Sequence, residues 1–145
     1  FGKKDATKKA IEQAAKDAYI HHNIVEFKEG YKTYIGERGV TLSGGQKQRV
    51  SIARAIINKP KILIFDDCLS AVDTETEEII LKNIDHITKN RTAIIISHRV
   101  SSIKHADMII VLDKGEIIQQ GTHDQLSNKN GFYKDLFDQQ LLTDN

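Results

Sequence analysis

Apolar residues follow two different patterns along the chain. In TKKAIEQAAKDAY (7–19) they recur at helical spacing behind Thr7, the expected N-cap. The runs KILIF (61–65) and TAIIIS (92–97) are instead apolar without alternation, which is typical of strands buried on both faces. The pattern therefore predicts helices combined with buried strands. The residues expected on the inner face of the first helix are Ala10, Ile11, Ala14, Ala15 and Ala18.

Two further helices are expected to begin at capping boxes. Ser43 stands three residues before Gln46, and the helix that it opens should run to about Asn58. Thr74 and Glu77 have the same spacing and predict a second helix. The residues expected to face inward from that helix are Ile80, Ile84 and Ile87.

The remaining segments complete an alternation of strands and helices. Residues 25–39 carry three glycines and no sustained period, which predicts a loop. A short helix is expected near 100–105, two strands within 107–121 joined at Lys114 and Gly115, and two helices at the end. This order predicts an α/β layered fold with a largely parallel sheet.

Composition excludes several classes of protein. The 145 residues carry 21 basic and 20 acidic side chains, so the formal net charge of +1 gives no electrostatic case for nucleic acid. Cys68 is the only cysteine, which excludes an internal disulfide and fits a reducing compartment. The first residues lack the apolar core of a signal peptide, and the chain does not begin with methionine. We therefore expect it to be part of a longer protein.

A glycine-rich segment, GVTLSGGQKQR (39–49), is a candidate phosphate site. Ser43, Gly44, Gly45 and Gln46 fall where a helix begins, and backbone N–H groups at such a turn can bind an anion. The alternative is a capped helix with glycines that allow a tight turn. A P-loop is excluded, because Gly45 stands where the lysine is needed and no apolar strand leads into the turn.

Polar residues also follow the two apolar runs. Asp66 and Asp67 come directly after the first run, and His98 follows the second. Ligands of open α/β sheets bind at the carboxyl ends of the strands, where one carboxylate can hold Mg²⁺ and a histidine can donate to a phosphate oxygen. The alternatives are two turn-capping aspartates and a structural histidine.

Together these segments resemble the ATP-binding domain of ABC transporters, in particular exporters. The resemblance covers essentially the whole chain. It implies a P-loop NTPase-like α/β fold, with part of a helical signature subdomain in 1–60 and the C-terminal half of the ATPase core in 61–145. The motifs that carry it are LSGGQKQR (42–49), similar to the family's signature; ILIFDD (62–67), similar to Walker B; SAVD (70–73), similar to the D-loop; SH (97–98), similar to the switch histidine; and YIGERG (34–39), similar to the exporters' coupling loop.

The resemblance implies a role for each matching residue. Asp66 would hold Mg²⁺, through water, at the subunit's own ATP, and His98 would contact the γ-phosphate there. Ser43, Gly44, Gly45 and Gln46 would bind the ATP of the opposite subunit, and Asp73 would lie on the dimer interface. Coupling to the transmembrane domain, and hence a place at the cytoplasmic face of the cell membrane, would fall to Gly36, Glu37, Arg38 and Gly39.

One position departs from the family pattern. Asp67 stands where competent sites carry a glutamate that positions the attacking water. Because a misplacement of about 1 Å can cost on the order of 10²-fold in rate, this would be the weakly hydrolysing site of an asymmetric transporter. The expected partner is then a second ATP-binding domain, in a heterodimer, that carries the glutamate.

Two further expectations follow from the resemblance. The family's P-loop would precede residue 1, so the isolated chain should be inactive and should not bind ATP measurably. The strand that leads into the P-loop would also be missing, which should leave KILIF or TAIIIS either with an unpaired edge or paired with another copy of the chain. A soluble ABC-type ATPase of DNA repair or translation is the alternative function, against which YIGERG and the near-zero net charge argue.

Overall fold

The computed structural model describes residues 2–36, 39–89 and 91–143. The chain divides into two compact units, Phe1–Ile96 and Ser97–Asn145, here called unit 1 and unit 2. The two family subdomains expected from the sequence, with a boundary at 60/61, stay a prediction. No helix in the described part is long and apolar enough to span a membrane.

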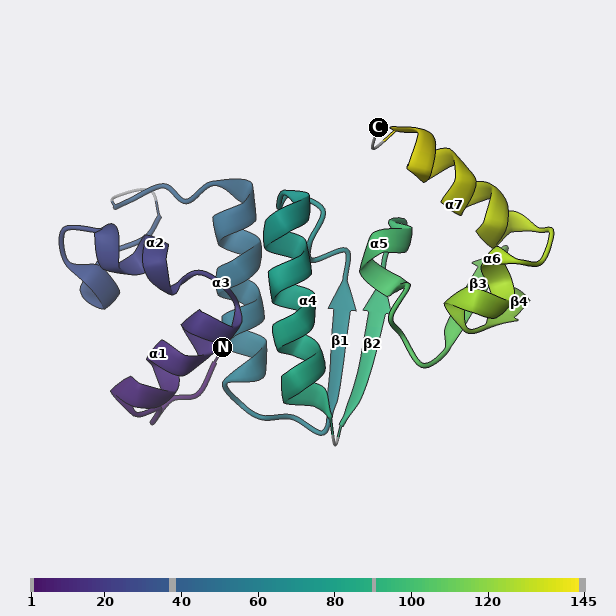
Figure 1. Ribbon diagram of the computed structural model, residues 1–145. Helices are drawn as coiled ribbons and strands as arrows, with labels where there is room; N and C mark the ends of the chain where they lie inside the picture. Colours follow the sequence, from purple (N-terminus) through teal and green to yellow (C-terminus); the bar gives the residue numbers. More distant parts are fainter. Residues whose placement is uncertain (1, 37–38, 90, 144–145) are drawn as a thin grey trace. The chain divides into compact units, whose positions relative to one another are not determined.

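Unit 1 contains the helices α1 to α4 and a parallel pair of strands (Figure 1). In the figure, α3 and α4 run side by side, with β1 next to α4. The elements are α1 (Lys8–Asp17), α2 (His21–Glu26), the 3₁₀ turn η1 (Gly30–Lys32), α3 (Gly44–Ile56), β1 (Ile62–Asp66), α4 (Thr74–Thr88) and β2 (Thr92–Ile96).

The predicted helix starts are correct for α1 and α3. Thr7 accepts a hydrogen bond from the Ala10 amide at 3.3 Å. Ser43 and Gln46 form a complete capping box on α3, which ends at Ile56, close to the predicted end. The short α2 was not predicted, since a helix of only six residues without a side-chain cap gives little periodic signal.

The predicted start of α4 is wrong by one residue. Asp73 is the N-cap, and its carboxylate accepts a hydrogen bond from the Thr76 amide at 2.9 Å. Thr74 is therefore the first helical residue and not the cap. Aspartate caps at least as well as threonine, so the preceding carboxylate takes the position. Glu77, expected as the capping partner, is buried instead.

The two strands of unit 1 are covered on one face. β1 pairs in parallel with β2, with Ile64 opposite Ile94 and Asp66 opposite Ile96. Leu63 and Phe65, each 3% exposed, pack into a core with residues of α1, α3 and α4. The alternate residues of β1 point to the other face, where Ile62 and Ile64 are 60% and 62% exposed.

The predicted burial of both strand faces is therefore wrong for this chain. The described residues supply helices to one face only, and β2 is exposed along most of its length. We call the uncovered side, formed by Ile62, Ile64, Ile94 and Ile96, the open face. As expected, each strand also has an unpaired edge, since within the described ranges each pairs with one neighbour.

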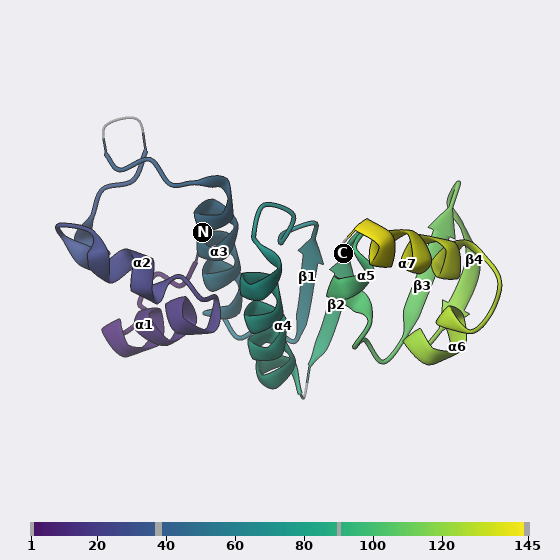
Figure 2. The same ribbon diagram turned by 45° about the horizontal axis from the view of Figure 1, so that its top comes forward.

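Unit 2 contains a hairpin and three helices, shown from a second angle in Figure 2. Lys114 and Gly115 join the strands with φ of 48° and 84°, as a tight hairpin turn requires. The core consists of Val100, Ile109, Leu126 and Tyr133. The elements are α5 (Val100–Ile103), β3 (Ile109–Asp113), β4 (Glu116–Gly121), α6 (His123–Ser127) and α7 (Phe132–Thr143).

Candidate functional site

The turn Ser43–Gln46, here called the glycine turn, is held in its conformation by hydrogen bonds of its own side chains. The Ser43 hydroxyl accepts from the Gln46 amide at 3.2 Å, and the Gln46 side-chain oxygen accepts from the Ser43 amide at 3.0 Å. Both side chains act as acceptors, so the Ser43 O–H and the Gln46 side-chain NH₂ remain as donors. Ser43 and Gly44 are exposed. The turn can therefore present several donors to an anion.

The glycines of this turn also allow a close approach of another segment. A Cβ atom on Gly45 would lie 2.7 Å from the backbone oxygen of Ala71, which is too close for any side chain. A Cβ on Gly44 would meet the Ala71 side chain at 3.4 Å, an ordinary contact. Gly45 is thus required by packing inside this chain, whereas Gly44 is not.

Asp66 and Asp67 end β1 in different conformations. Asp66 is the last residue of the strand and points to the open face with Ile62 and Ile64. Asp67 follows with φ of 45°, in the left-handed region, and its amide donates to the Ile96 oxygen at 3.0 Å. Both side chains are exposed. The change of backbone conformation at Asp67 therefore takes this residue out of the side-chain alternation of the strand.

These carboxylates fit Mg²⁺ held together with a phosphate ligand. No group of three or more His, Cys, Asp or Glu in the described part could hold a metal by itself. Mg²⁺ commonly takes only one or two carboxylates, with waters and substrate phosphates completing its coordination. An exposed Asp66 at a strand end meets that requirement.

Asp73 is anionic at neutral pH. The hydrogen bond from the Thr76 amide, together with the nearby Arg49 guanidinium, lowers the pKa of the Asp73 carboxyl. Arg49 is held in place by donating to the Tyr19 oxygen at 2.6 Å and to the Gly45 oxygen at 3.2 Å. The exposed Asp73 can therefore contact a partner while it caps α4.

His98 belongs to unit 2 and lies in a loop fixed by α7. The side chain of Gln140 donates to the His98 oxygen at 2.7 Å and accepts from the Val100 amide at 2.8 Å. The histidine itself is exposed. Its expected place at the same sheet edge as Asp66 stays a prediction.

Comparisons with known proteins agree with this set of segments. The family model described as ABC transporter matches residues 3–70. A probable multidrug resistance ABC transporter ATP-binding/permease protein of Bacillus subtilis, YheI, is 48% identical over 98% of this chain and 24% of its own length. The leukotoxin translocation ATP-binding protein LktB of Mannheimia haemolytica is 54% identical over 88% of this chain and 18% of its own length.

A solved structure agrees as well. The structure of a bacterial Atm1-family ABC exporter with ATP bound matches 97% of this chain and 25% of that one, with a TM-score of 0.91 and 43% identity. The chain belongs to the ABC transporter ATP-binding family. It spans about a quarter of the length of YheI. The predicted family and fold class are thereby confirmed.

The coupling loop expected in this ABC domain is partly described. Ile35 and Val40 form a bridge that closes the turn, and Gly36 has φ of 125°. A side chain on Gly39 would overlap the Tyr34 backbone, so Gly36 is required by its backbone conformation and Gly39 by close packing. Tyr34 and Ile35 are exposed at this turn. Glu37 and Arg38 lie outside the described residues.

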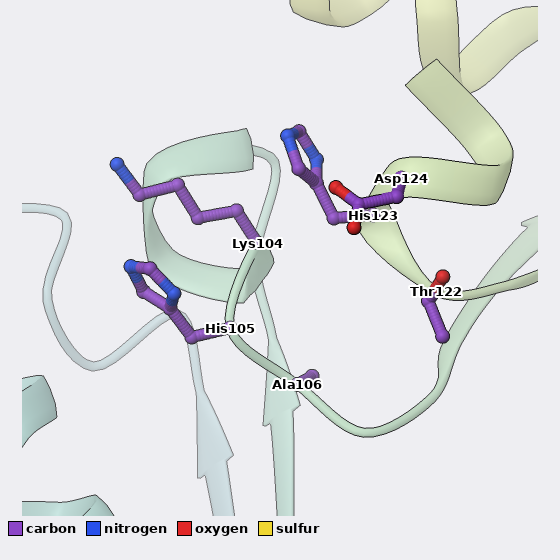
Figure 3. Close-up of a pocket in the computed structure, with 6 residues that line it drawn as sticks. All are labelled: Lys104, His105, Ala106, Thr122, His123 and Asp124. Carbon is purple, nitrogen blue, oxygen red and sulfur yellow. The ribbon is translucent and has the colours of Figure 1, made fainter. Parts of the chain in front are cut away.

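A shallow pocket of about 430 Å³ in unit 2 of the ABC domain contains none of the predicted site residues. Figure 3 shows Lys104 and His105 on one side of it and His123 and Asp124 on the other. His123 is hydrogen-bonded to the Tyr133 hydroxyl at 2.9 Å and packs edge-on against Phe137. His123 therefore contributes to the local packing of unit 2. The lining residues are Lys104, His105, Ala106, Thr122, His123 and Asp124.

Sequence reasoning missed two glutamines of this ABC domain, Gln48 and Gln140, which hold the loops that carry Asp67 and His98. Gln48 accepts from the Ala71 amide at 2.9 Å and donates to the Ser70 hydroxyl at 3.0 Å. It lies three and four residues after the signature glycines, on the same helical face, so the spacing could have indicated it. No sequence signal indicates Gln140, which lies about forty residues from the loop that it holds.

Proposed function

We propose that the chain is part of the ATP-binding domain of an ABC exporter, and that it supplies residues to two composite ATP sites. The glycine turn serves the nucleotide of the opposite subunit, and Asp66, Asp67 and His98 serve the nucleotide of its own. The observation that carries this proposal is the glycine turn, where the capping box is complete, Ser43 and Gly44 are exposed, and the Ser43 O–H and the Gln46 side-chain NH₂ are not used by the cap. In the whole protein this domain is a transport-coupled ATPase at the cytoplasmic face of the membrane.

The chemistry of each residue follows from its position. Asp66 holds Mg²⁺, which neutralises charge on the phosphates. Asp67 accepts a hydrogen bond from the attacking water, while His98 donates to a γ-phosphate oxygen. In the other site, the donors of the glycine turn stabilise the negative charge that develops on the transferred phosphoryl group.

Asp67 makes the subunit's own site the weaker of the two. Its carboxylate is one methylene shorter than glutamate and its backbone is fixed at both ends, because the Asp67 amide donates to Ile96 and the Asp67 oxygen accepts from the Ser70 hydroxyl. The loop is therefore constrained from moving to compensate for the shorter side chain. We infer that the partner is a second ATP-binding domain that carries a glutamate.

The proposal is tested with the full-length transporter reconstituted in liposomes. Ser43→Arg should abolish hydrolysis at the partner's site, because the larger side chain blocks the γ-phosphate and removes the hydroxyl donor. Ser51→Arg, at an exposed serine of the same helix, is the matched control and should leave the rate unchanged. A full rate in the Ser43 variant would exclude the glycine turn from any ATP site.

The alternative, a soluble ABC-type ATPase of DNA repair or translation, makes a different prediction. Its hydrolysis should be stimulated by duplex DNA or by RNA in the absence of a membrane. The full-length exporter should show no such stimulation, because its formal charge in this segment is only +1.

A further inference from the structure

The loop 67–72 joins two residues with different proposed roles. It begins at Asp67, which acts on the subunit's own nucleotide, and it ends next to Asp73, at the proposed dimer interface. The loop does not pack on its own strand alone. It lies against the first turns of α3, where Gly45 approaches the Ala71 oxygen so closely that no Cβ fits.

Gln48 fastens this loop to α3 with both ends of its amide. Its oxygen accepts from the Ala71 amide at 2.9 Å, and its nitrogen donates to the Ser70 hydroxyl at 3.0 Å. The Ser70 hydroxyl in turn donates to the Asp67 oxygen at 3.0 Å. The Ala71 N–H requires an acceptor, so the amide orientation is set by the network.

The same helix carries the glycine turn at its start. Gly44, Gly45 and Gln48 share one helical face, so a shift of the glycine turn must move Gln48 with it. Through Ser70 that movement reaches the backbone of Asp67. A continuous set of hydrogen bonds therefore links the segment that serves the partner's nucleotide to the residue that serves the subunit's own.

We propose that Gln48 is a positioning residue that couples the glycine turn to Asp67, an inference that rests on the proposed function. Both ends of the Gln48 amide are engaged by the loop, so we assign it no contact with either nucleotide. Its removal should therefore lower kcat while leaving the KM for ATP nearly unchanged. Because a displacement of about 1 Å of a catalytic group can cost on the order of 10²-fold, a partly released loop should cost about 10-fold.

The test uses the full-length transporter in which the glutamate of the partner site has been replaced, so that the residual rate reports the Asp67 site alone. Gln48→Ala should lower this residual kcat about 10-fold, with KM within about twofold. Gln13→Ala is the matched control, since Gln13 is also a helical glutamine, whose amide bonds only to Asp17 within α1. It should change neither constant.

Gln48→Glu separates hydrogen bonding from packing. The carboxylate keeps the acceptor for the Ala71 amide but loses the donor to Ser70. Protonation of the introduced glutamate restores that donor. The rate of this variant relative to the unsubstituted protein should therefore rise as the pH is lowered, whereas the ratio for Gln48→Ala should stay flat. Parallel pH profiles for the two variants would overturn the positioning role.

Hydrogen exchange gives a readout that does not depend on activity. The Ala71 amide should exchange at least several-fold faster in Gln48→Ala than in Gln13→Ala, because its acceptor is gone. Unchanged exchange would overturn the inference whatever the rate of hydrolysis. If exchange increases but residual kcat is unchanged, the clamp exists and the coupling is wrong. An inactive unsubstituted transporter would instead contradict the proposed function.

Discussion

The loops that follow β1 and β2 are fixed in the same way, but the two helices that fix them differ in whether they carry a proposed site. Each is held by one glutamine side chain that donates to a carbonyl or hydroxyl oxygen and accepts from a backbone amide. Gln48 lies on α3, which also carries the glycine turn, whereas Gln140 lies on α7, which carries no proposed site residue. In the proposed coupling, the Asp67 loop can therefore respond to a ligand at the glycine turn, which opens the same helix one turn before Gln48. The His98 loop has no such connection through its clamp.

Neither loop should bind nucleotide without further segments. The proposal assigns the groups of these loops to two different composite sites, and the P-loop that supplies most phosphate donors in this family is not among them. We expect the isolated 145-residue polypeptide to bind Mg-ATP at least 10³-fold more weakly than the full-length transporter. Calorimetric titration measures this. A dissociation constant in the low micromolar range would show that the phosphate site has been misplaced.

Replacing Asp67 with the longer glutamate tests whether the Asp67 loop limits hydrolysis. In the full-length transporter with the partner's glutamate replaced, Asp67→Glu should raise the residual hydrolysis rate by about 10²-fold, since the carboxylate regains its reach to the water. Single-turnover measurements check this. Ser51→Arg in the same background serves as the control, because Ser51 is an exposed residue of α3 outside the proposed sites. If Asp67→Glu leaves the protein inactive, position 67 marks the asymmetry without causing it.

Cys68 reports on the Asp67 loop alone, since the His98 loop has no cysteine. Burial raises the pKa of its thiol to about 11, from an ordinary value of 9.0. The thiolate is then about 100-fold scarcer at pH 8, and the higher nucleophilicity of a more basic thiolate recovers roughly half of that on a logarithmic scale. Iodoacetamide should therefore react about 10-fold more slowly than with a model thiol.

The same thiol tests the clamp. Gln48→Ala should accelerate alkylation of Cys68 and Gln140→Ala should not, because the Gln140 side chain bonds to His98 and Val100 in the other loop. The sign of the pH effect is also fixed. The pKa of Cys68 is higher in the folded protein than in the unfolded chain, because burial disfavours the thiolate. This thiol therefore does not reduce the free energy of unfolding below about pH 9, and it reduces it progressively as the pH rises from 9 towards 11.

The smallest expected effect concerns Gln140. Gln140→Ala should speed exchange of the Val100 amide by roughly fivefold, the equivalent of one lost hydrogen bond, and should leave the Ala71 amide unchanged. Gln48→Ala should give the reverse result. Hydrogen exchange followed by NMR resolves both amides. A change at both amides in either variant would mean that the two loops are not held independently.

Local chemistry explains which features the sequence predicted. The Ser43 and Gln46 cap and the Lys114–Gly115 turn depend on residues within three positions of one another. The predicted start of α4 was wrong because two neighbouring residues can act as N-cap. Thr74 and Glu77 have the spacing of a capping box, but Asp73, one residue earlier, caps the helix. The positions of the strands were predicted correctly, but their exposure was not. An apolar run such as KILIF predicts burial on both faces, and it does not show which segment would cover each face. Contacts made by Gln48 and Gln140 span many residues, and no local pattern encodes them.

The backbone at Asp67 has an evolutionary consequence. Its φ of 45° is adopted more readily by aspartate and asparagine than by glutamate, whose longer side chain cannot bond locally to the turn. Catalysis and backbone preference therefore favour different residues at this position. Once the partner's site performs most of the hydrolysis, selection for a side chain long enough to reach the water is relaxed. The preference of the left-handed backbone for aspartate over glutamate remains. We therefore expect a site relieved of turnover to keep aspartate at this position, since a change to glutamate works against the local conformation.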